Sequence, residues 1–346
     1  MIKRTLKRFS FCDFFACVIS TPYTTRLQIS QSQKLKNAFK DFFGALPIKW
    51  RFFCSMKKIY LTILILFVLS SSVFSQGELL LGIGGKYKKI KKDIYDTALV
   101  SAYYKLAYLK DSTRTSSYTK GLTVLSFSDK YVRFGDYYRL LADSVNDMCA
   151  EDKKKARDES LNVEHSNYIS KTAFYTATMT DLENRQTTVQ IDFLLKYEYT
   201  MPTPDLRWIL ESGDTLINGV ACKKATCNYA GRHYIAWYDE NFPIPYGPYI
   251  FYGLPGLIMK IYDDKRNWIF ENVGIEKAES LREMYLYKRK DIIKTSREHA
   301  LAAYKNQLEN MLRAAIESGR VKIIKKGPRF DEKLKKRPSN MIEQEW

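Results

Sequence analysis

The stretch "FYGLPGLIMKIYDD" (Phe251–Asp264) places two glycines and a proline directly before an apolar run. Leu254 precedes Pro255 and is therefore restricted to an extended conformation. Pro-Gly at the two central positions is typical of a type II turn, which predicts a positive φ at Gly256. Gly253 leaves room for a ring or a backbone to approach. The stretch predicts a sharp corner before a buried strand, and a ligand site at this corner is the alternative.

The residues after this corner alternate as those of a strand do. Leu257, Met259 and Ile261 point to one face, and Ile258 lies on the other. A second apolar run, "NWIFENVGI" (Asn267–Ile275), follows across the polar residues "DDKRN". Two such runs joined by a short polar turn predict a β-hairpin.

Similar Tyr-rich runs recur along the chain, separated by short polar turns. Residues 97–111 and 121–129 predict a first hairpin, and further runs cover 185–202 and 219–243. Helices do not alternate with strands, as they do in parallel sheets. The sequence therefore predicts a mainly β fold, an antiparallel strongly curved sheet or open barrel with a C-terminal helix. A slip in the apolar phase at Lys223–Lys224 also predicts a β-bulge.

Two helical regions are predicted beside the strands. Asp143–Leu161 is charged and lacks a strong apolar face, which favours an exposed helix or an insertion over a core element. Ser296–Gly319 reads as one helix, with Ser296 as N-cap and Gly319 as C-cap. The residues after Gly319 are basic and then acidic, which predicts a tail.

The region near the N-terminus contains a targeting pattern. "MKKIYLTILILFVLSSSVFSQ", which begins at Met56, has two lysines, an apolar run and a small-residue end. This pattern is typical of a secretory signal peptide cleaved before Gln76. The alternative is a membrane anchor, but the apolar run of about 11 residues is shorter than the roughly 20 that span a bilayer. We expect an exported protein without a stable transmembrane anchor after cleavage.

The predicted organisation has four parts. Residues 1–55 are interpreted as an upstream extension assigned in error, with a genuine N-terminal extension as the alternative. A signal peptide occupies 56–75, a β domain 76–280, and a C-terminal helix with a basic tail 281–346.

The charge and the cysteines limit the function classes. The formal net charge is +18, yet residues 1–75 alone hold 12 Lys and Arg against 2 Asp and Glu. Much of the basic excess thus lies outside the predicted mature protein, which argues against nucleic-acid binding. Cys149, Cys222 and Cys227 follow the signal peptide. Cys222 and Cys227 share a predicted strand about 16 Å apart, too far for a disulfide.

The sequence holds few signs of catalysis or of metal binding. Only His165, His233 and His299 are present, and no two of them have metal-ligand spacing. A nucleophile elbow, a phosphate-binding loop and a zinc-protease motif are all lacking. The sequence therefore favours a non-catalytic protein without a cofactor or metal. A hydrolase whose acid and base come from separate strands is the alternative.

The candidate binding residues lie just before the glycine-rich corner. Arg232, in an aromatic strand, is a candidate for holding a carboxylate or stacking on a ring. A structural pair between Arg232 and a buried acid is the alternative. Trp237 and Tyr238 point to opposite faces of their strand, so one of them is expected in the core. The other is expected to line an aromatic surface with three tyrosines, Tyr246, Tyr249 and Tyr252.

The chain resembles the GLPGLI family, exported proteins found mainly in Bacteroidota. The hexapeptide is intact from Gly253 through Leu254, Pro255, Gly256 and Leu257 to Ile258. Upstream, seven residues occupy places typical of the family, namely Arg232, Trp237, Tyr238, Pro243, Pro245, Gly247 and Pro248. Asp239 and Phe242 stand where Thr and Ile are usual, and "NMIEQE" near the C-terminus has Met341 in place of a Pro.

This resemblance covers roughly Ala98–Glu345 and implies a location and an architecture more than an activity. It implies an envelope protein in the periplasm, at the outer membrane or secreted. We expect it to bind an apolar, carbohydrate or protein ligand on a curved aromatic-rich sheet. The ligand or envelope partner is not specified by the sequence. A more distant likeness to the N-terminal domain of a secreted PNGase F-type enzyme carries no expectation.

Overall fold

The computed structural model describes residues 87–319, 321–323 and 330–346, without the side chains of 278–282 and 333. The predicted upstream extension and signal peptide, and the first residues of the predicted β domain, lie outside the described residues. None of the described helices is long and apolar enough to cross a membrane.

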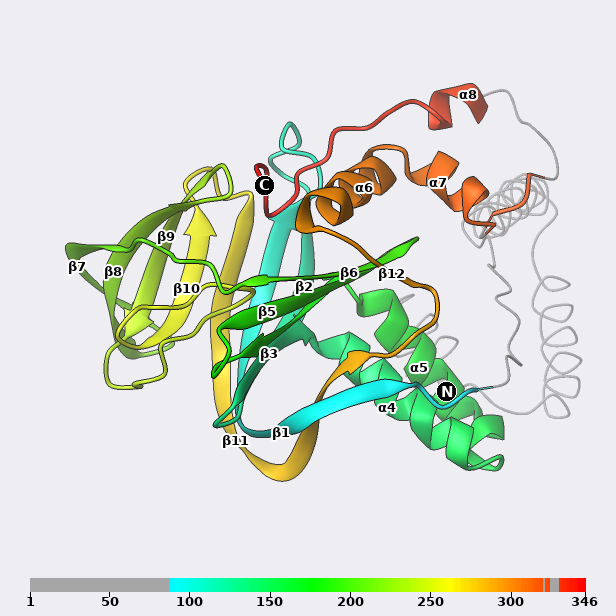
Figure 1. Cartoon of the computed structure of the whole chain (residues 1–346), viewed down its shortest axis with the longest axis horizontal. Coiled ribbons are helices and arrows are strands. Elements are labelled where there is room, and N and C mark those ends of the chain that lie inside the picture. The colour runs from blue at the N-terminus through cyan, green and yellow to red at the C-terminus, as the bar shows by residue number, and fades with distance from the viewer. Residues whose placement is uncertain (1–86, 320, 324–329) are drawn as a thin grey trace, which may run out of the picture. The chain divides into compact units, whose positions relative to one another are not determined.

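The described part of the chain is built on one 12-stranded sheet (Figure 1). In spatial order the strands run β12-β6-β5-β4-β3-β2-β1-β11-β10-β9-β8-β7. The strands are β1 (Lys92–Leu109), β2 (Tyr118–Phe127), β3 (Tyr131–Asp136), β4 (Thr176–Asp181), β5 (Gln186–Asp192), β6 (Lys196–Pro202), β7 (Ile209–Ile217), β8 (Val220–Tyr229), β9 (Arg232–Asp239), β10 (Leu257–Asp263), β11 (Trp268–Tyr287) and β12 (Ile292–Lys294).

The sheet confirms the predicted fold class in part. The protein is mainly β, and every neighbouring pair is antiparallel except β12 and β6, which are parallel. Within the described residues β12 and β7 each pair with a single neighbour, so the sheet does not close, and it is not strongly curled. The expectation of a strongly curved sheet or open barrel was therefore wrong. Strand runs and turns in the sequence indicate which strands pair, but not whether the two edges meet.

The hairpins predicted from the sequence are confirmed. β1 pairs with β2, β8 with β9, and β10 with β11. The irregularity predicted at Lys223–Lys224 is present, but the extra residues belong to β7. Its register shifts between Glu211 and Asp214, opposite these two lysines, whereas β8 keeps its register with β9.

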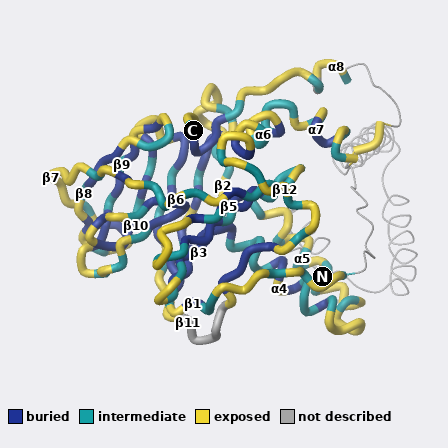
Figure 2. Tube along the Cα trace, viewed as in Figure 1, coloured by how far each residue is buried: buried dark blue, intermediate teal, exposed yellow. Residues whose placement is uncertain are grey.

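The core lies along the central strands, and part of β1 is buried at alternate residues (Figure 2). In β1, Ala102, Tyr104 and Leu106 are at most 1% exposed, while Lys105 between them is exposed. This period of two is what a strand with one buried face requires. β11 continues to Tyr287 and thus crosses the predicted domain boundary after residue 280.

Two helices interrupt the chain between β3 and β4. They are α4 (Tyr137–Glu151) and α5 (Glu159–Lys171), joined by the short helix η1 (Lys155–Arg157). α4 begins where β3 ends, because the Asp136 side chain accepts a hydrogen bond from the Arg139 backbone N–H, an N-cap. Four of its residues are buried, including Asp143. The expected insertion is therefore present between β3 and β4, and α5 has no buried residue, but α4 is partly buried, unlike an exposed helix.

The C-terminal helical region differs from the predicted single helix. Ser296 is the N-cap, as expected, but α6 (Arg297–Glu309) ends at Asn310 and α7 (Met311–Glu317) follows. α6 packs on the sheet through Ala300 and Leu301, next to Val189 and Tyr199 of β5 and β6. A last short helix, α8, spans Phe330–Lys333.

The glycine-rich corner adopts a different backbone from the predicted type II turn. The positive φ belongs to Gly253, at 97°, and not to Gly256. Gly256 is required for a different reason. A Cβ there would lie 1.9 Å from the carbonyl oxygen of Asp239, whose residue pairs with Leu257 in the sheet. Close backbone approach, and not turn geometry, therefore demands a glycine at this position.

Candidate functional site

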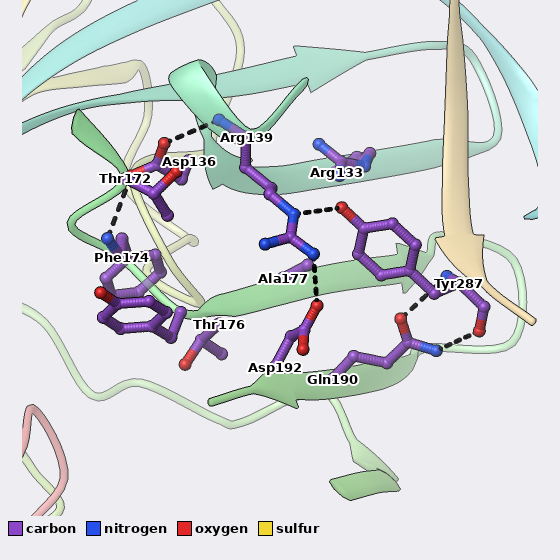
Figure 3. Close-up of a pocket in the computed structure, with 11 residues that line it drawn as sticks. Arg133, Asp136, Arg139, Thr172, Phe174, Thr176, Ala177, Gln190, Asp192 and Tyr287 are labelled. Atoms are coloured by element: carbon purple, nitrogen blue, oxygen red, sulfur yellow. Dashed lines mark hydrogen bonds and ion pairs between the residues drawn. The ribbon is translucent and has the colours of Figure 1, made fainter. Parts of the chain in front are cut away.

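A small polar pocket lies where α4 and α5 meet the sheet (Figure 3). The space open to the centres of water-sized molecules is about 30 Å³. Its walls come from the ends of β3, β5 and β11 and from the start of β4. Eleven residues line it: Arg133, Asp136, Arg139, Thr172, Phe174, Tyr175, Thr176, Ala177, Gln190, Asp192 and Tyr287.

Asp136 forms one wall and holds the local backbone together. Beyond capping α4, its carboxylate accepts hydrogen bonds from the backbone N–H groups of Ala173 and Phe174, at 2.9 and 3.0 Å. Burial raises the pKa of the Asp136 carboxyl above its ordinary value, and these backbone hydrogen bonds oppose that rise. One carboxylate thus fixes both the start of α4 and the return of the chain into β4.

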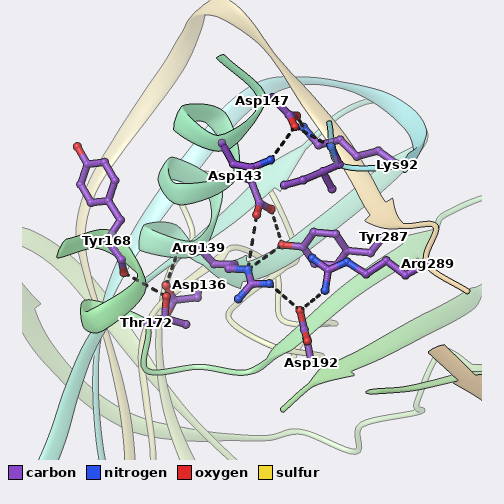
Figure 4. A network of polar contacts seen from close by, with 12 residues as sticks. Lys92, Asp136, Arg139, Asp143, Asp147, Tyr168, Thr172, Asp192, Tyr287 and Arg289 are labelled. Atoms are coloured by element: carbon purple, nitrogen blue, oxygen red, sulfur yellow. Dashed lines mark hydrogen bonds and ion pairs between the residues drawn. The ribbon is translucent and has the colours of Figure 1, made fainter. Parts of the chain in front are cut away.

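Arg139 lies at the centre of a network of charges (Figure 4). Its Nη2 donates to Asp192 at 2.8 Å, and its Nε lies 3.6 Å from Asp143. Arg289 also donates to Asp192 at 2.8 Å. Burial acts to lower the pKa of the Arg139 guanidinium, but Tyr287, Asp192 and Asp143 outweigh it and raise that pKa. The guanidinium is therefore permanently charged and fixed in place.

Asp143 accepts two tyrosine hydroxyls from the end of β11. The Tyr285 hydroxyl donates at 2.7 Å, and the Tyr287 hydroxyl donates as well. Burial, followed by the charge of Asp143, raises the pKa of both phenols. The two tyrosines therefore stay protonated and act as donors, which ties α4 to β11 behind the pocket.

Arg133 differs from the other arginines of the network. It is 3% exposed, its Nε donates to the carbonyl oxygen of Tyr285 at 2.9 Å, and its guanidinium lies 5.1 Å from the centre of the Tyr285 ring. Its Nη1 has no hydrogen-bond partner within the described residues. The pocket therefore contains one buried donor that is not satisfied.

Arg232, a predicted binding residue, is bound to the chain itself. Its guanidinium donates to Asp263 at 2.9 Å, to the side chain of Asn340 at 2.6 Å, and to the carbonyl of Ile342 at 3.1 Å. The structural pair with a buried acid is thus present. The contacts also show that residues 340–343, predicted as part of a tail, are buried against β9. We call residues 340–343, together with their contacts to the rest of the chain, the C-terminal clasp.

Of the other predicted binding residues, two are buried and three are half-buried. Tyr238 and Tyr249 are 2% and 4% exposed, and the Tyr249 hydroxyl donates to Glu343 in the clasp. Trp237 is half-buried on the face of β9 opposite Tyr238. Tyr246 and Tyr252 are half-buried and stack on each other with ring centres 6.0 Å apart. A binding role for these residues stays a prediction.

The glycine-rich motif lies largely in the core. Leu254, Leu257 and Ile258 are at most 1% exposed. The Tyr104 hydroxyl donates to the carbonyl oxygen of Ile258 at 2.8 Å. The ring of Trp208 lies 3.8 Å from where a Cβ of Gly253 would be. The motif therefore joins the loop before β10 to the centre of the sheet.

Residues suited to metals or redox chemistry do not gather in the described part of the chain. No group of three or more His, Cys, Asp or Glu there has the arrangement of a metal site. Cys149, Cys222 and Cys227 are free and buried. Burial raises the pKa of Cys222 to about 11 and that of Cys227 to about 12. Such thiols are poor nucleophiles.

Sequence reasoning did not find the pocket. Arg133, Asp136 and Arg139 lie within seven residues of each other in "RFGDYYR", but Asp192 and Tyr287 are far away in the chain. The available signal was the "FGDYYR" junction, where an aspartate after an apolar strand precedes a helical pattern. That pattern indicates a cap, but it does not indicate a pocket.

The fold and site together define a mainly β protein with a small pocket lined largely by polar residues, beside the start of α4 and the end of α5. No family model matches the chain, and no curated protein matches it. Similar solved structures include PNGF-II in two crystal forms, with 12% and 13% sequence identity and a TM-score of 0.38 each. The matches cover 60% and 62% of this chain but only 33% of the PNGF-II chains. Similarity at this level carries no argument about activity.

Proposed function

We propose that the chain is an exported, non-catalytic envelope protein of the GLPGLI type that binds a ligand. The motif "GLPGLI" with its upstream residues, and the signal-peptide pattern from Met56, support this proposal. The location is the periplasm, the outer membrane or the medium. Recognition of an apolar, carbohydrate or protein ligand on the aromatic residues remains part of the proposal, with Tyr246 and Tyr252 as the most accessible tyrosines of the predicted set.

The non-catalytic part of the proposal is supported by the hydrogen bonds and ion pairs that occupy three carboxylates in and beside the pocket. Asp136 accepts three backbone N–H groups, Asp143 accepts two tyrosine hydroxyls, and Asp192 binds two guanidinium groups. A general acid or base must be free to exchange a proton with a substrate. These three carboxylates are instead committed to positioning other groups.

A hydrolase is the second candidate, favoured by one observation. Asp136 and Asp192 line the same pocket, and burial raises the pKa of Asp136. A raised carboxyl pKa in a pocket is a feature of general acids. Under this alternative, Asp136 would donate a proton while Asp192 remained charged.

Two experiments test the proposal. Cell fractionation and intact-mass measurement should find the mature protein outside the cytoplasm, beginning at Gln76; a product that retains residues 1–55 would contradict export from Met56. A screen of the purified protein against glycoside, ester and peptide substrates should show no turnover. Activity that is lost in Asp192→Asn, with the fold intact by circular dichroism, would establish the hydrolase instead.

A further inference from the structure

Arg133 is a buried cation without a carboxylate partner in the part of the chain that the structure describes. The other arginines of the core and pocket each pair with an acid among the described residues: Arg139 with Asp192, Arg289 with Asp192, Arg232 with Asp263, and Arg297 with Glu343. Arg133 makes no such ion pair, although it is 3% exposed. Its contacts are a carbonyl oxygen and the face of a tyrosine ring.

An unpaired guanidinium in such a place is unfavourable. Taking a charged group out of water carries a large penalty unless an opposite charge and hydrogen bonds replace the water. The carbonyl of Tyr285 occupies Nε, and the ring offers a weaker attraction. Nη1 remains with neither kind of compensation within the described residues.

The free atom lies close to another residue of the pocket lining. A Cβ placed on Gly135 would be 3.4 Å from Arg133 Nη1 and 3.7 Å from the Cβ of Ala177, so the three groups lie together. Arg133 and Ala177 both line the pocket (Figure 3). A side chain longer than glycine at 135 would take up part of the space beside Nη1.

The acids of the pocket do not serve Arg133, because each already has other partners. Asp136 is held by backbone N–H groups and Asp192 by two other guanidinium groups. The pocket also lies at the first turn of α4, whose N-terminal end carries a partial positive charge. The Thr176 hydroxyl, a donor as well as an acceptor, also lines the pocket, whereas the Thr172 hydroxyl already donates to the carbonyl oxygen of Tyr168 at 3.2 Å.

The size of the pocket limits the ligand. A space of about 30 Å³ for molecular centres accommodates roughly two or three water-sized bodies, given about 10–15 Å³ for each. That is room for a carboxylate or a small oxyanion, but not for a sugar ring. A larger ligand would place only its charged group inside.

We infer that this pocket binds a small oxyanion group, such as a carboxylate, with Arg133 as the residue that pairs with its charge. This inference rests on the proposed binding function and names the ligand class. Atoms of the anion would accept from Arg133 Nη1 and from the Thr176 hydroxyl. The source is either a free anion or the acidic end of a longer molecule.

The test is titration of the purified protein with acetate, hexanoate and inorganic phosphate, followed by calorimetry and thermal unfolding. Sodium chloride at equal ionic strength is the reference. Phosphate also stabilises proteins by exclusion from their surface, so the diagnostic quantity is the difference between the parent and an Arg133 variant. Arg133→Met should weaken binding by roughly tenfold or more, because charge-assisted hydrogen bonds are the strong ones.

Matched variants separate pocket effects from charge effects. Arg313→Gln removes the same charge from an exposed position on α7 and should bind like the parent. Ala177→Met keeps every charge but fills the pocket, and should abolish binding. If Arg133→Met does not fold, Ala177→Met still tests whether the anion binds in the pocket. Without ligand, Arg133→Met should melt at or above the parent temperature, since it removes an uncompensated buried charge.

The outcomes are separable. Tighter binding of hexanoate than of acetate identifies the acidic end of a longer ligand, and equal binding of acetate and phosphate identifies a free anion. The inference is overturned if none of the three probes binds saturably in the millimolar range, or if Arg133→Met and Ala177→Met bind like the parent. Failure of anion binding would not decide the proposed non-catalytic function, which the substrate screen tests separately.

Discussion

The replacement of Gly256 by alanine is the sharpest test of how the glycine-rich motif acts. The added Cβ would lie 1.9 Å from the carbonyl oxygen of Asp239 and 2.6 Å from its carbonyl carbon. Both atoms belong to backbone that is paired in register with Leu257. A flexible side chain could rotate away, but these atoms can separate only if β9 and β10 move apart.

The magnitude follows from this rigidity. Overpacking of a well-packed core costs about 1–3 kcal/mol and occasionally more. Because the obstacle is backbone, we expect the upper end, about 3 kcal/mol of unfolding free energy. For a protein of this size that corresponds to a fall of roughly 6–12 °C in melting temperature.

Two other glycines provide matched controls in the same assay. A Cβ on Gly274 or on Gly219 would meet no atom within 4 Å. Gly274→Ala should therefore melt like the parent. Gly219 has a φ of 80°, so Gly219→Ala should lose only about 1–2 kcal/mol from the left-handed backbone.

Differential scanning calorimetry of the three variants ranks them. The expected order of destabilisation is Gly256→Ala, then Gly219→Ala, then Gly274→Ala. If Gly256→Ala melted like Gly274→Ala, the close approach to Asp239 would not constrain the fold. If it also lost ligand binding while remaining folded, the motif would be a binding site.

The remaining predictions concern the thiols and the C-terminal clasp. Cys222 and Cys227, with thiol pKa values raised to about 11 and about 12, should react with a thiol reagent at pH 8 only after denaturation. The protonated thiols favour the folded state, so their contribution to the free energy of unfolding is complete below the unfolded thiol pKa. This stabilisation is lost as pH rises towards the folded-state pKa values, and melting temperatures from pH 8 to 11 should therefore fall. Glu343→Gln should cost about 3–5 kcal/mol by chemical denaturation, because it leaves Arg297 without its partner in the clasp, whereas exposed Glu345→Gln should be neutral.

Most of the sheet could be predicted because its signals are local. The apolar residues Val189 and Ile191 of β5, two positions apart, are at most 1% exposed, and this spacing is read directly from the local sequence. Hairpins follow from polar turns between such runs. The closure of the sheet could not be predicted, since it depends on long-range twist and on where β7 and β12 end.

The error at Gly256 has a physical cause. Pro-Gly favours a type II turn when no other part of the chain constrains it, but here the backbone at the end of β9 lies directly against Gly256. Contact with Asp239 excludes a side chain at 256 without requiring a positive φ there. The residue with a positive φ is Gly253 instead. A sequence pattern reports the need for glycine, but it does not distinguish conformational need from spatial need.

The predicted site and the observed pocket contain different arginines, and the reason is again one that the sequence pattern does not report. Arg232 lies in the most recognisable part of the sequence, and Asp263, Asn340 and Ile342 satisfy it within the chain. A buried polar group that the fold satisfies completely stabilises the fold, and it needs no ligand. Arg133 lies in an unremarkable sequence, yet its Nη1 is the donor that the pocket leaves unsatisfied. Whether an arginine is structural or ligand-binding is thus decided by the balance of its hydrogen bonds after folding, which for Arg133 depends on Tyr285 of β11, distant in sequence.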